Sequence, residues 1–221
     1  MRVFVTGSGT DIGKTWVTAR WVEALRAAGQ AVTALKPVLS GMDAVPLEET
    51  DAGRLVAAMG QPVTPAAVGQ ICPWQFGPPI SPDMAAARVG RPLSLENLAA
   101  FCRDHPAERL IVEGVGGVMV PLNDRDLVLD WMVALDFPVV LVTGSYLGAL
   151  SHTLTAVRSI EGAGLQLAAV LVSQSTVEPV SLAETVQTLQ RFCTAPVWAV
   201  PRDGSLSAAR WQALSARCGA G

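Results

Sequence analysis

A glycine-rich stretch near the amino terminus carries the residues best suited to chemistry; residues 6–15 read TGSGTDIGKT. Residues suited to a buried strand precede it, and apolar residues at helical spacing follow it as far as Gly29. In such a turn, backbone N–H groups and the open end of the next helix converge on an anion. A lysine then supplies positive charge to the outer phosphates and a hydroxyl binds magnesium. Lys14 and Thr15 are predicted to fill these roles in a phosphate-binding loop, although a glycine turn with a solvated lysine is the simpler alternative.

Three further strand ends carry polar residues that could act beside this loop. Lys36 follows one strand and is followed by a proline, with Ser40 four residues later. Glu113 ends the apolar run 110–112 and is followed by glycines that let the backbone approach a ligand. Asp51 opens a helical segment at 52–59, where it could compensate the helix dipole or reach a magnesium ion.

The spacing of apolar residues predicts the elements that position these side chains. Strands are expected at residues 3–6, 31–35, 110–112, 139–143, 168–172 and 197–200, and helices at 15–28, 95–103, 127–135, 152–161, 182–192 and 207–217. Apolar strands that alternate with amphipathic helices predict an α/β fold with a mostly parallel sheet and helices on both faces. Ligands collect at the carboxyl ends of such strands.

Composition limits the class of protein. The chain has 221 residues, is 50% hydrophobic and carries a net charge of -3, which favours one domain, residues 1–221, and no nucleic-acid partner. The longest apolar run, near residues 137–143, is too short to cross a bilayer, and a strand begins at once where a signal peptide would lie. No membrane association and a cytoplasmic location are therefore expected. The four scattered cysteines are expected to be reduced and mostly packed.

Other segments offer weaker signals. The glycine loop at 144–148, ahead of a helix, offers free N–H donors that suit a carboxylate or phosphate. Loops after the last two strands are candidates for holding a nucleotide base. Residues 72–82 are rich in proline and aromatic residues and are interpreted as a rigid loop, either one wall of a pocket or a packed surface lid.

Several of these stretches together resemble the dethiobiotin synthetases, a family of P-loop NTPases. The resemblance rests on the glycine loop, on KPV at 36–38, SG at 40–41, TDA at 50–52, SP at 81–82, VEGVGG at 112–117, LG at 147–148 and SH at 151–152, which occur in the family's order. The chain departs from the family where Ser173-Gln174 replaces an asparagine-aspartate pair, where Asp83 replaces a histidine, and where Ser8-Gly9 replaces threonine-aspartate.

The resemblance implies a single-domain P-loop NTPase fold and an ATP-dependent ligase. It would carboxylate 7,8-diaminopelargonic acid with CO2 and close the ring to dethiobiotin, through a carbamate and a carbamic-phosphoric anhydride. The substrates ATP, CO2 and diaminopelargonic acid, the ion Mg2+ and a homodimer are implied as well.

The resemblance also implies roles for individual residues. Lys14, Lys36 and Ser40 would be catalytic, and Thr15, Asp51 and Glu113 would hold the metal. The substrate would contact Thr10, Lys36, Ser40, Gly117, Leu147 and Gly148, the last two across the dimer interface. The ATP site would comprise Gly9, Thr10, Asp11, Ile12, Gly13, Lys14, Thr15, Trp16, Asp51, Glu113, Gly114, Val115, Gly116, Ser173, Gln174, Val200, Pro201 and Arg202.

Three other classes fit the phosphate-binding loop less well. A nucleotide-switch ATPase of the partition or metal-insertion type commonly carries a second lysine early in that loop, and residues 7–12 contain none. A cobyrinate-type amidotransferase would require a glutaminase domain. A non-catalytic nucleotide-binding module would not need the charges of Lys36, Asp51 and Glu113.

Overall fold

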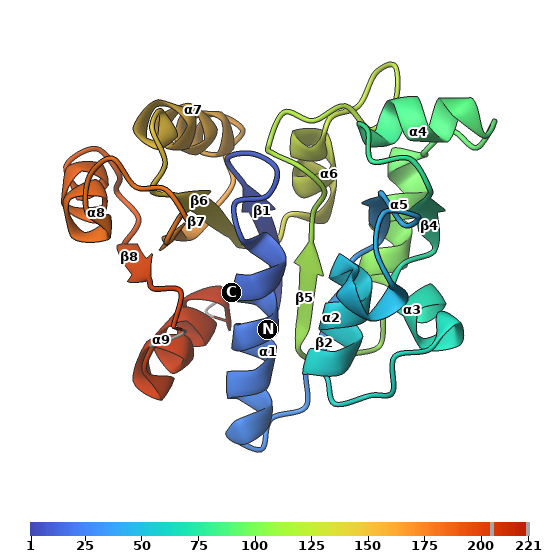
Figure 1. Ribbon diagram of the computed structural model, residues 1–221, viewed down its shortest axis with the longest axis horizontal. Helices are drawn as coiled ribbons and strands as arrows, with labels where there is room; N and C mark the ends of the chain where they lie inside the picture. Colours follow the sequence, from blue (N-terminus) through green and yellow to red (C-terminus); the bar gives the residue numbers. More distant parts are fainter. Residues whose placement is uncertain (204–205, 220–221) are drawn as a thin grey trace.

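A parallel sheet forms the centre of the computed structural model, which describes residues 1–203 and 206–219 (Figure 1). Within these residues, six strands pair in the order β2-β5-β1-β6-β7-β8, and each neighbouring pair is parallel. The strands are β1 Arg2–Gly7, β2 Thr33–Leu35, β5 Leu110–Glu113, β6 Val139–Gly144, β7 Leu167–Ser173 and β8 Val197–Val200. Helix α7 lies above β6 and β7, and α9 lies below them (Figure 1). The predicted α/β fold is confirmed.

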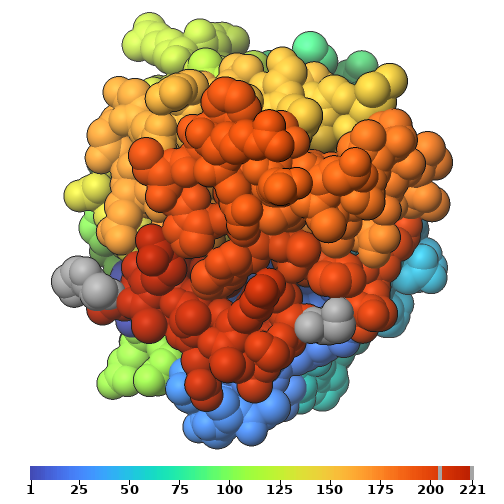
Figure 2. All heavy atoms as spheres, turned by 90° about the vertical axis from the view of Figure 1, so that its left-hand side faces the viewer, coloured from blue at the N-terminus to red at the C-terminus, as the bar shows by residue number. Residues whose placement is uncertain are grey.

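The central strands are continuous apolar runs because helices cover both faces of the sheet. All four residues of β5 and all six of β6 are buried, and the ring of Phe4 in β1 packs edge-on against Trp131 in α6. The helices are α1 Lys14–Ala27, α2 Asp51–Ala58, α3 Pro65–Ile71, α4 Pro82–Arg88, α5 Leu95–Arg103, α6 Val128–Leu135, α7 Ala149–Gly162, α8 Leu182–Gln190 and α9 Ala208–Gly219. Figure 2 shows the face that α8 and α9 cover, in orange and red.

A second, two-stranded sheet lies beside the main one and was not predicted. Strand β3, Val38–Ser40, pairs in parallel with β4, Trp74–Phe76. The interpretation of residues 72–82 as a loop is therefore wrong in part, because this stretch contains β4 and the first residue of α4. A one-turn 3-10 helix, η1 Leu47–Glu49, was also missed. Each of these elements has only three residues, too few to show a period.

Three predicted boundaries are wrong by two residues and one is wrong by three. The helix expected at 207–217 ends at Gly219, and the helix expected at 152–161 begins at Ala149. The strand expected at 31–35 begins at Thr33, because α1 ends in a turn in which Gly29 adopts φ 73° and the Gln30 N–H donates to the carbonyl of Leu25. The first ladder bond of that strand runs from the N–H of Thr33 to Arg109. The helix expected to reach residue 192 ends at Gln190.

Two expectations from composition can be compared with the fold. No helix in residues 1–203 and 206–219 is both long and apolar enough to span a membrane. All four cysteines are free thiols, and Cys72, Cys102 and Cys218 are buried. Burial raises the pKa of the Cys72 and Cys102 thiols to about 12, which keeps them protonated.

Candidate functional site

The glycine-rich loop runs from the end of β1 to the first turn of α1. Gly13 adopts a left-handed conformation, with φ 94°, and directly precedes α1. A Cβ there would lie 2.6 Å from the hydroxyl of Ser173 at the end of β7, so both the backbone angle and the close approach require glycine. The ammonium of Lys14 turns back over the loop and donates to the carbonyl of Gly9 at 2.8 Å.

A cavity of about 640 Å³ opens at the carboxyl ends of the strands above this loop. Its walls include eleven of the residues predicted from sequence, namely Thr10, Asp11, Gly13, Lys14, Thr15, Trp16, Lys36, Ser40, Asp51, Val115 and Gly116. Pro79 to Pro82 line it as well, so the stretch 72–82 does form one wall. Lys14 and Lys36 therefore face a common space, as the phosphate-binding hypothesis requires.

At the cavity wall, Lys36 is held in a cluster of charges. Its Nζ lies 2.7 Å from Oε1 of Glu113, 2.8 Å from the carbonyl of Gly114 and 3.2 Å from Oδ2 of Asp51. Lys36 and Glu113 are at most 1% exposed. Burial alone would lower the pKa of Lys36, but the two carboxylates outweigh it and raise that pKa above the usual lysine value. Lys36 is therefore a fixed cation.

The hydroxyl of Thr15 joins the same cluster by donating to Oε1 of Glu113 at 2.6 Å. Burial would raise the pKa of Asp51, but Lys36 and the Thr15 hydroxyl lower it overall, so Asp51 is ionised. The second carboxylate oxygen of Glu113, Oε2, is buried and has no hydrogen-bond partner within the described part of the chain. Such an orphaned acceptor is costly unless another donor or a cation meets it.

Lys14 differs electrostatically from Lys36. Burial, together with repulsion from Lys36, lowers its pKa from 10.5 to about 8. The carboxylates of Glu113 and Asp51 only partly compensate. Lys14 is thus a cation held in the site at a cost, which an incoming anion would relieve.

The oxygen donors around this cavity suit magnesium. Among the described residues, no three His, Cys, Asp or Glu side chains lie close enough together to hold a metal by themselves. Magnesium is usually bound by one or two carboxylates together with substrate phosphates and waters, so Thr15, Asp51 and Glu113 match that chemistry.

A second cavity, of about 820 Å³, lies on the other side of the glycine-rich loop. Its lining includes Gly9, Ile12, Gly117, Tyr146, His152 and residues 155, 156 and 159 of α7. Thr10, Asp11 and Val120 line both cavities, so the loop separates two adjoining spaces.

A chain of hydroxyls, of which those of Thr143 and Thr153 are buried, ties the loop to α7. Thr143 Oγ1 lies 2.8 Å from Ser8 Oγ and 2.6 Å from Thr153 Oγ1. Thr153 in turn donates to the carbonyl of Ala149 at 2.6 Å, in the first turn of α7. Sequence reasoning missed this connection.

The two loops predicted to hold the base lie together. Ser175 of the first loop lines the second cavity, whereas Gln174 and residues 200–202 line neither cavity. The Gln174 N–H donates to the carbonyl of Val200 at 3.0 Å, and the Gln174 Oε1 accepts from the N–H of Arg202 at 3.2 Å. The Gln174 amide nitrogen donates to Glu178 at 2.9 Å. Its side chain is therefore engaged within the protein, while Ser173 reaches the phosphate-binding loop through Gly13.

Comparison with known proteins identifies the family. A family described as an AAA domain matches residues 1–210. The ATP-dependent dethiobiotin synthetase BioD of Methylobacterium nodulans is 42% identical over 214 residues, which cover 93% of this chain and 95% of that protein. That of Acidiphilium cryptum is 47% identical over 192 residues, which cover 85% of this chain and 86% of that protein. The chain belongs to the ATP-dependent dethiobiotin synthetase family. The resemblance stated from sequence is thereby confirmed, as is the class of ATP-dependent ligase.

A solved structure shares the fold of this dethiobiotin synthetase family member without close sequence similarity. The ParA family ATPase from Chlorobium tepidum superposes with a TM-score of 0.54 at 14% identity, covering 98% of this chain and 89% of that one. Such a likeness shows the P-loop ATPase fold alone. The partition-type alternative is therefore not favoured, because the close sequence relatives are dethiobiotin synthetases.

Leu147 and Gly148, predicted from the dethiobiotin synthetase resemblance to act across a subunit interface, line neither cavity of this chain. Leu147 is 84% exposed, and Gly148 adopts φ 95° directly before α7. Their neighbours Tyr146 and His152 are joined by a hydrogen bond of 2.8 Å between the phenol and Nδ1.

Arg54 lines the 640 Å³ cavity but belongs to none of the dethiobiotin synthetase sequence landmarks. The signal that could have found it is its spacing, since it follows Asp51 by three residues on the same helix and so shares its face.

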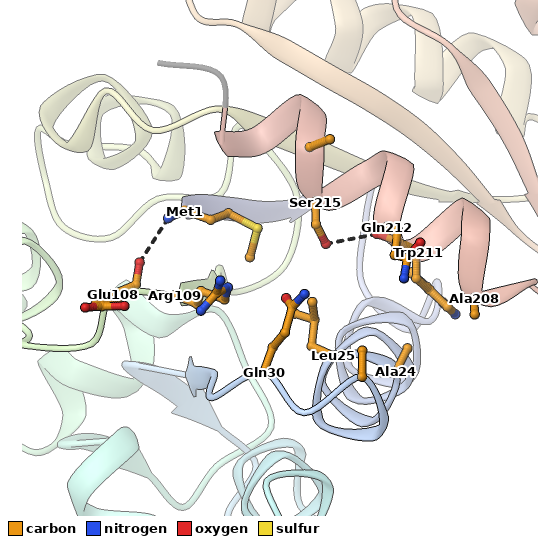
Figure 3. A pocket seen from close by; sticks show the side chains of 12 residues that line it. Met1, Ala24, Leu25, Gln30, Glu108, Arg109, Ala208, Trp211, Gln212 and Ser215 are labelled. Carbon is orange, nitrogen blue, oxygen red and sulfur yellow. Dashed lines mark hydrogen bonds between the residues drawn. The ribbon is translucent and has the colours of Figure 1, made fainter.

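A third cavity, of about 370 Å³, lies at the opposite edge of the sheet. It is bounded by Met1, by Leu25 near the end of α1, by Arg109 ahead of β5 and by Trp211 of α9 (Figure 3). None of the predicted site residues lines it, so it is separate from the phosphate-binding loop.

Proposed function

We propose that this chain carboxylates 7,8-diaminopelargonic acid with CO2 and closes the cyclic urea of dethiobiotin at the expense of ATP. The observation that carries the proposal is the cavity that Lys14, Lys36 and Asp51 share, with Glu113 buried behind it. Two cations above a glycine-rich loop match a reaction in which a terminal phosphate is transferred to an anion.

The chemistry proceeds in three steps. One amine of the substrate attacks CO2 and loses a proton, which gives a carbamate. A carbamate oxygen attacks the γ-phosphorus of ATP and ADP leaves, which gives a carbamic-phosphoric anhydride. The second amine attacks the anhydride carbon and loses a proton, the C–O bond to phosphate breaks and inorganic phosphate leaves, and the ring is closed.

The chain's residues bind and orient the reacting groups. Lys14 and the N–H groups of residues 9–13 hold the outer phosphates, where they stabilise charge that develops during transfer. Lys36, held in place by three acceptors, presents a permanent positive field to the carbamate. Ser40 and the backbone at Thr10, which line the same cavity, orient the carbamate.

Thr15, Asp51 and Glu113 would hold Mg2+, and the buried orphan oxygen of Glu113 supports this assignment. Bound there with the triphosphate, the ion would neutralise charge on the β- and γ-phosphates.

The proposal also covers the assembly and the rest of the nucleotide site. A homodimer is supported by the exposed apolar side chains of Leu147, Met119 and Leu150 around the second cavity and the start of α7. The substrate's carboxylate would meet the open N–H groups of α7 in the second subunit. The loops that contain Gln174 and Arg202 would border the base.

A single domain and a cytoplasmic setting complete the proposal. One buried apolar cluster extends from β1 to α9, which supports a single domain. The four free thiols fit a reducing compartment.

One assay tests the reaction. Purified protein is incubated with diaminopelargonic acid, bicarbonate, magnesium and each nucleoside triphosphate in turn, and dethiobiotin is sought by mass spectrometry. We expect ring formation with ATP and none with the Lys14→Met variant. Hydrolysis of ATP without any cyclic product would contradict the proposal and would favour a switch ATPase.

A further inference from the structure

Helix α2 is fixed tightly at its start, so the side chains of its first two turns have a defined direction. The Thr50 hydroxyl accepts from the N–H of Gly53 at 3.0 Å and donates to the carbonyl of Leu47 at 2.7 Å. A Cβ at position 53 would collide with that same carbonyl, so only glycine allows η1 to pack so closely against α2. This packing holds both Asp51 and Arg54 at the wall of the 640 Å³ cavity.

Arg54 differs from the other two cations of this cavity in its partners. Lys36 is saturated by Glu113, Gly114 and Asp51, and Lys14 donates to Gly9. The guanidinium of Arg54 is exposed and, within the described residues, has no hydrogen bond or ion pair. It is the cation of this wall whose donors are all available to a ligand.

The charges of the cavity favour an anion at this position. Glu113 and Asp51 balance the positive charges of Lys14 and Lys36. Asp11 of the glycine-rich loop also lines the cavity, but within the described residues it forms no ion pair with Arg54, whose charge is left unpaired at this wall. A triphosphate carries more negative charge than one magnesium ion can offset. A guanidinium also presents parallel N–H donors that match two phosphate oxygens, which an ammonium cannot do.

We propose that Arg54 binds the terminal phosphate of the nucleotide, and then the phosphate released from the anhydride, through two non-bridging oxygens. This inference rests on the proposed function for the identity of the nucleotide. It assigns Arg54 a binding role beside Lys14 that the sequence landmarks of the family do not contain. Asp51, one turn earlier on the same helix face, would hold the ion on the adjoining side of that phosphate.

Nucleotide binding without turnover tests the assignment. Dissociation constants of ATP and ADP with magnesium are measured by calorimetry for the wild type and for Arg54→Gln and Arg54→Lys. Arg210→Gln, on α9, is the matched control, because its side chain is also exposed, helical and without a partner in the described residues. Thermal melting checks that each variant is folded.

We expect Arg54→Gln to weaken ATP binding by about tenfold to 100-fold, in keeping with the loss of a charge-assisted bidentate contact. ADP binding should change by less than about twofold, since ADP lacks the group contacted. The ATP affinity of Arg54→Lys should lie between those of the wild type and Arg54→Gln. Added guanidinium chloride should partly restore ATP binding in Arg54→Gln and in no other variant. Equal losses for ATP and ADP, or an ATP affinity like that of Arg210→Gln, would overturn the assignment.

Turnover separates this inference from the proposed function. If the wild type makes dethiobiotin, inorganic phosphate should inhibit it about tenfold less strongly in Arg54→Gln, as the lost contact implies. If the wild type makes no dethiobiotin, the proposed function fails, while the difference between ATP and ADP binding still decides the role of Arg54.

Discussion

Lys36 Nζ and Glu113 Oε1 lie 2.7 Å apart, and both side chains are buried. Removing one partner of such a pair leaves an uncompensated charge, whereas removing both leaves none. We expect Lys36→Met to lower the free energy of unfolding by about 3 to 5 kcal/mol. The double variant Lys36→Met/Glu113→Gln should lose clearly less than the sum of the single losses. Urea unfolding of all four proteins gives these values, and simple additivity would show that the pair is not coupled.

The lowered pKa of Lys14 makes stability depend on pH. Between pH 8 and 10.5 the unfolded chain binds the lysine proton more than the folded chain does, because the folded pKa is about 8. Stability therefore rises with pH through that window, and the cost of the charged lysine is full below pH 8. We expect Lys14→Met to be more stable than the wild type at pH 7, with the difference shrinking toward pH 10.5, although we also expect this variant to make no dethiobiotin. Thermal melts at several pH values measure this, and a difference independent of pH would contradict it.

Glu113→Gln should weaken the response to magnesium. The change keeps the shape of the side chain but removes a negative charge and places an NH2 group among the donors of the cluster. We expect the magnesium concentration at half-maximal turnover to rise by about tenfold or more, as for the loss of a charged ligand contact. An unaltered magnesium titration would exclude Glu113 from the metal site. Glu184→Gln is a suitable control, because Glu184 is an exposed capping residue of α8.

Gly13→Ala should abolish nucleotide binding for two separable reasons. The positive φ of 94° strains any L side chain, and the new Cβ would meet the Ser173 hydroxyl at 2.6 Å. Adding Ser173→Gly removes the second obstacle only, so we expect partial recovery in the double variant. Calorimetry with ATP measures this. Full recovery would mean that the backbone angle is not limiting.

Thr143→Val should loosen the connection between the phosphate-binding loop and α7. The substitution keeps the shape but removes the central hydroxyl, so the Ser8 and Thr153 hydroxyls each lose a partner. We expect a loss of about 1 to 3 kcal/mol of stability. Thr6→Val is the matched control, because the Thr6 hydroxyl is buried without a partner in the described residues and its removal should cost nothing. Equal effects in the two variants would rule out the hydroxyl chain.

The phosphate-binding loop and the main strands could be predicted because their signals are local. A strand, a glycine turn and a helix follow one another within residues 2–27, and each apolar run contains its own period. No element was predicted over α3, and α4 was missed because its first residue, Pro82, was interpreted as part of a loop, although proline is favoured in a first helical turn. Strands β3 and β4 pair with each other across 33 intervening residues, so no local signal marks them.

The residues of the charge cluster could be predicted from sequence, but the ion pair between Lys36 and Glu113 could not. Sequence places Lys36 and Glu113 at strand ends on one edge of the sheet, yet they are 77 positions apart. The strand order puts β2 beside β5, and that neighbourhood is what turns two separate charges into an ion pair. Sequence reasoning treated Lys36 as a group free to meet the ligand, whereas the fold has already engaged its donors with acceptors of its own.

The chain has only two lysines, and both lie at the same cavity, while its other basic side chains are arginines or histidines. Apart from the α-amino group, every primary amine is thus an active-site group. A reagent that acylates lysine side chains can therefore react with lysine only at this cavity. The fraction of protein inactivated should follow the fraction of lysine modified. Bound ATP should slow this modification, so the rate of lysine acylation reports the fraction of enzyme that has ATP bound.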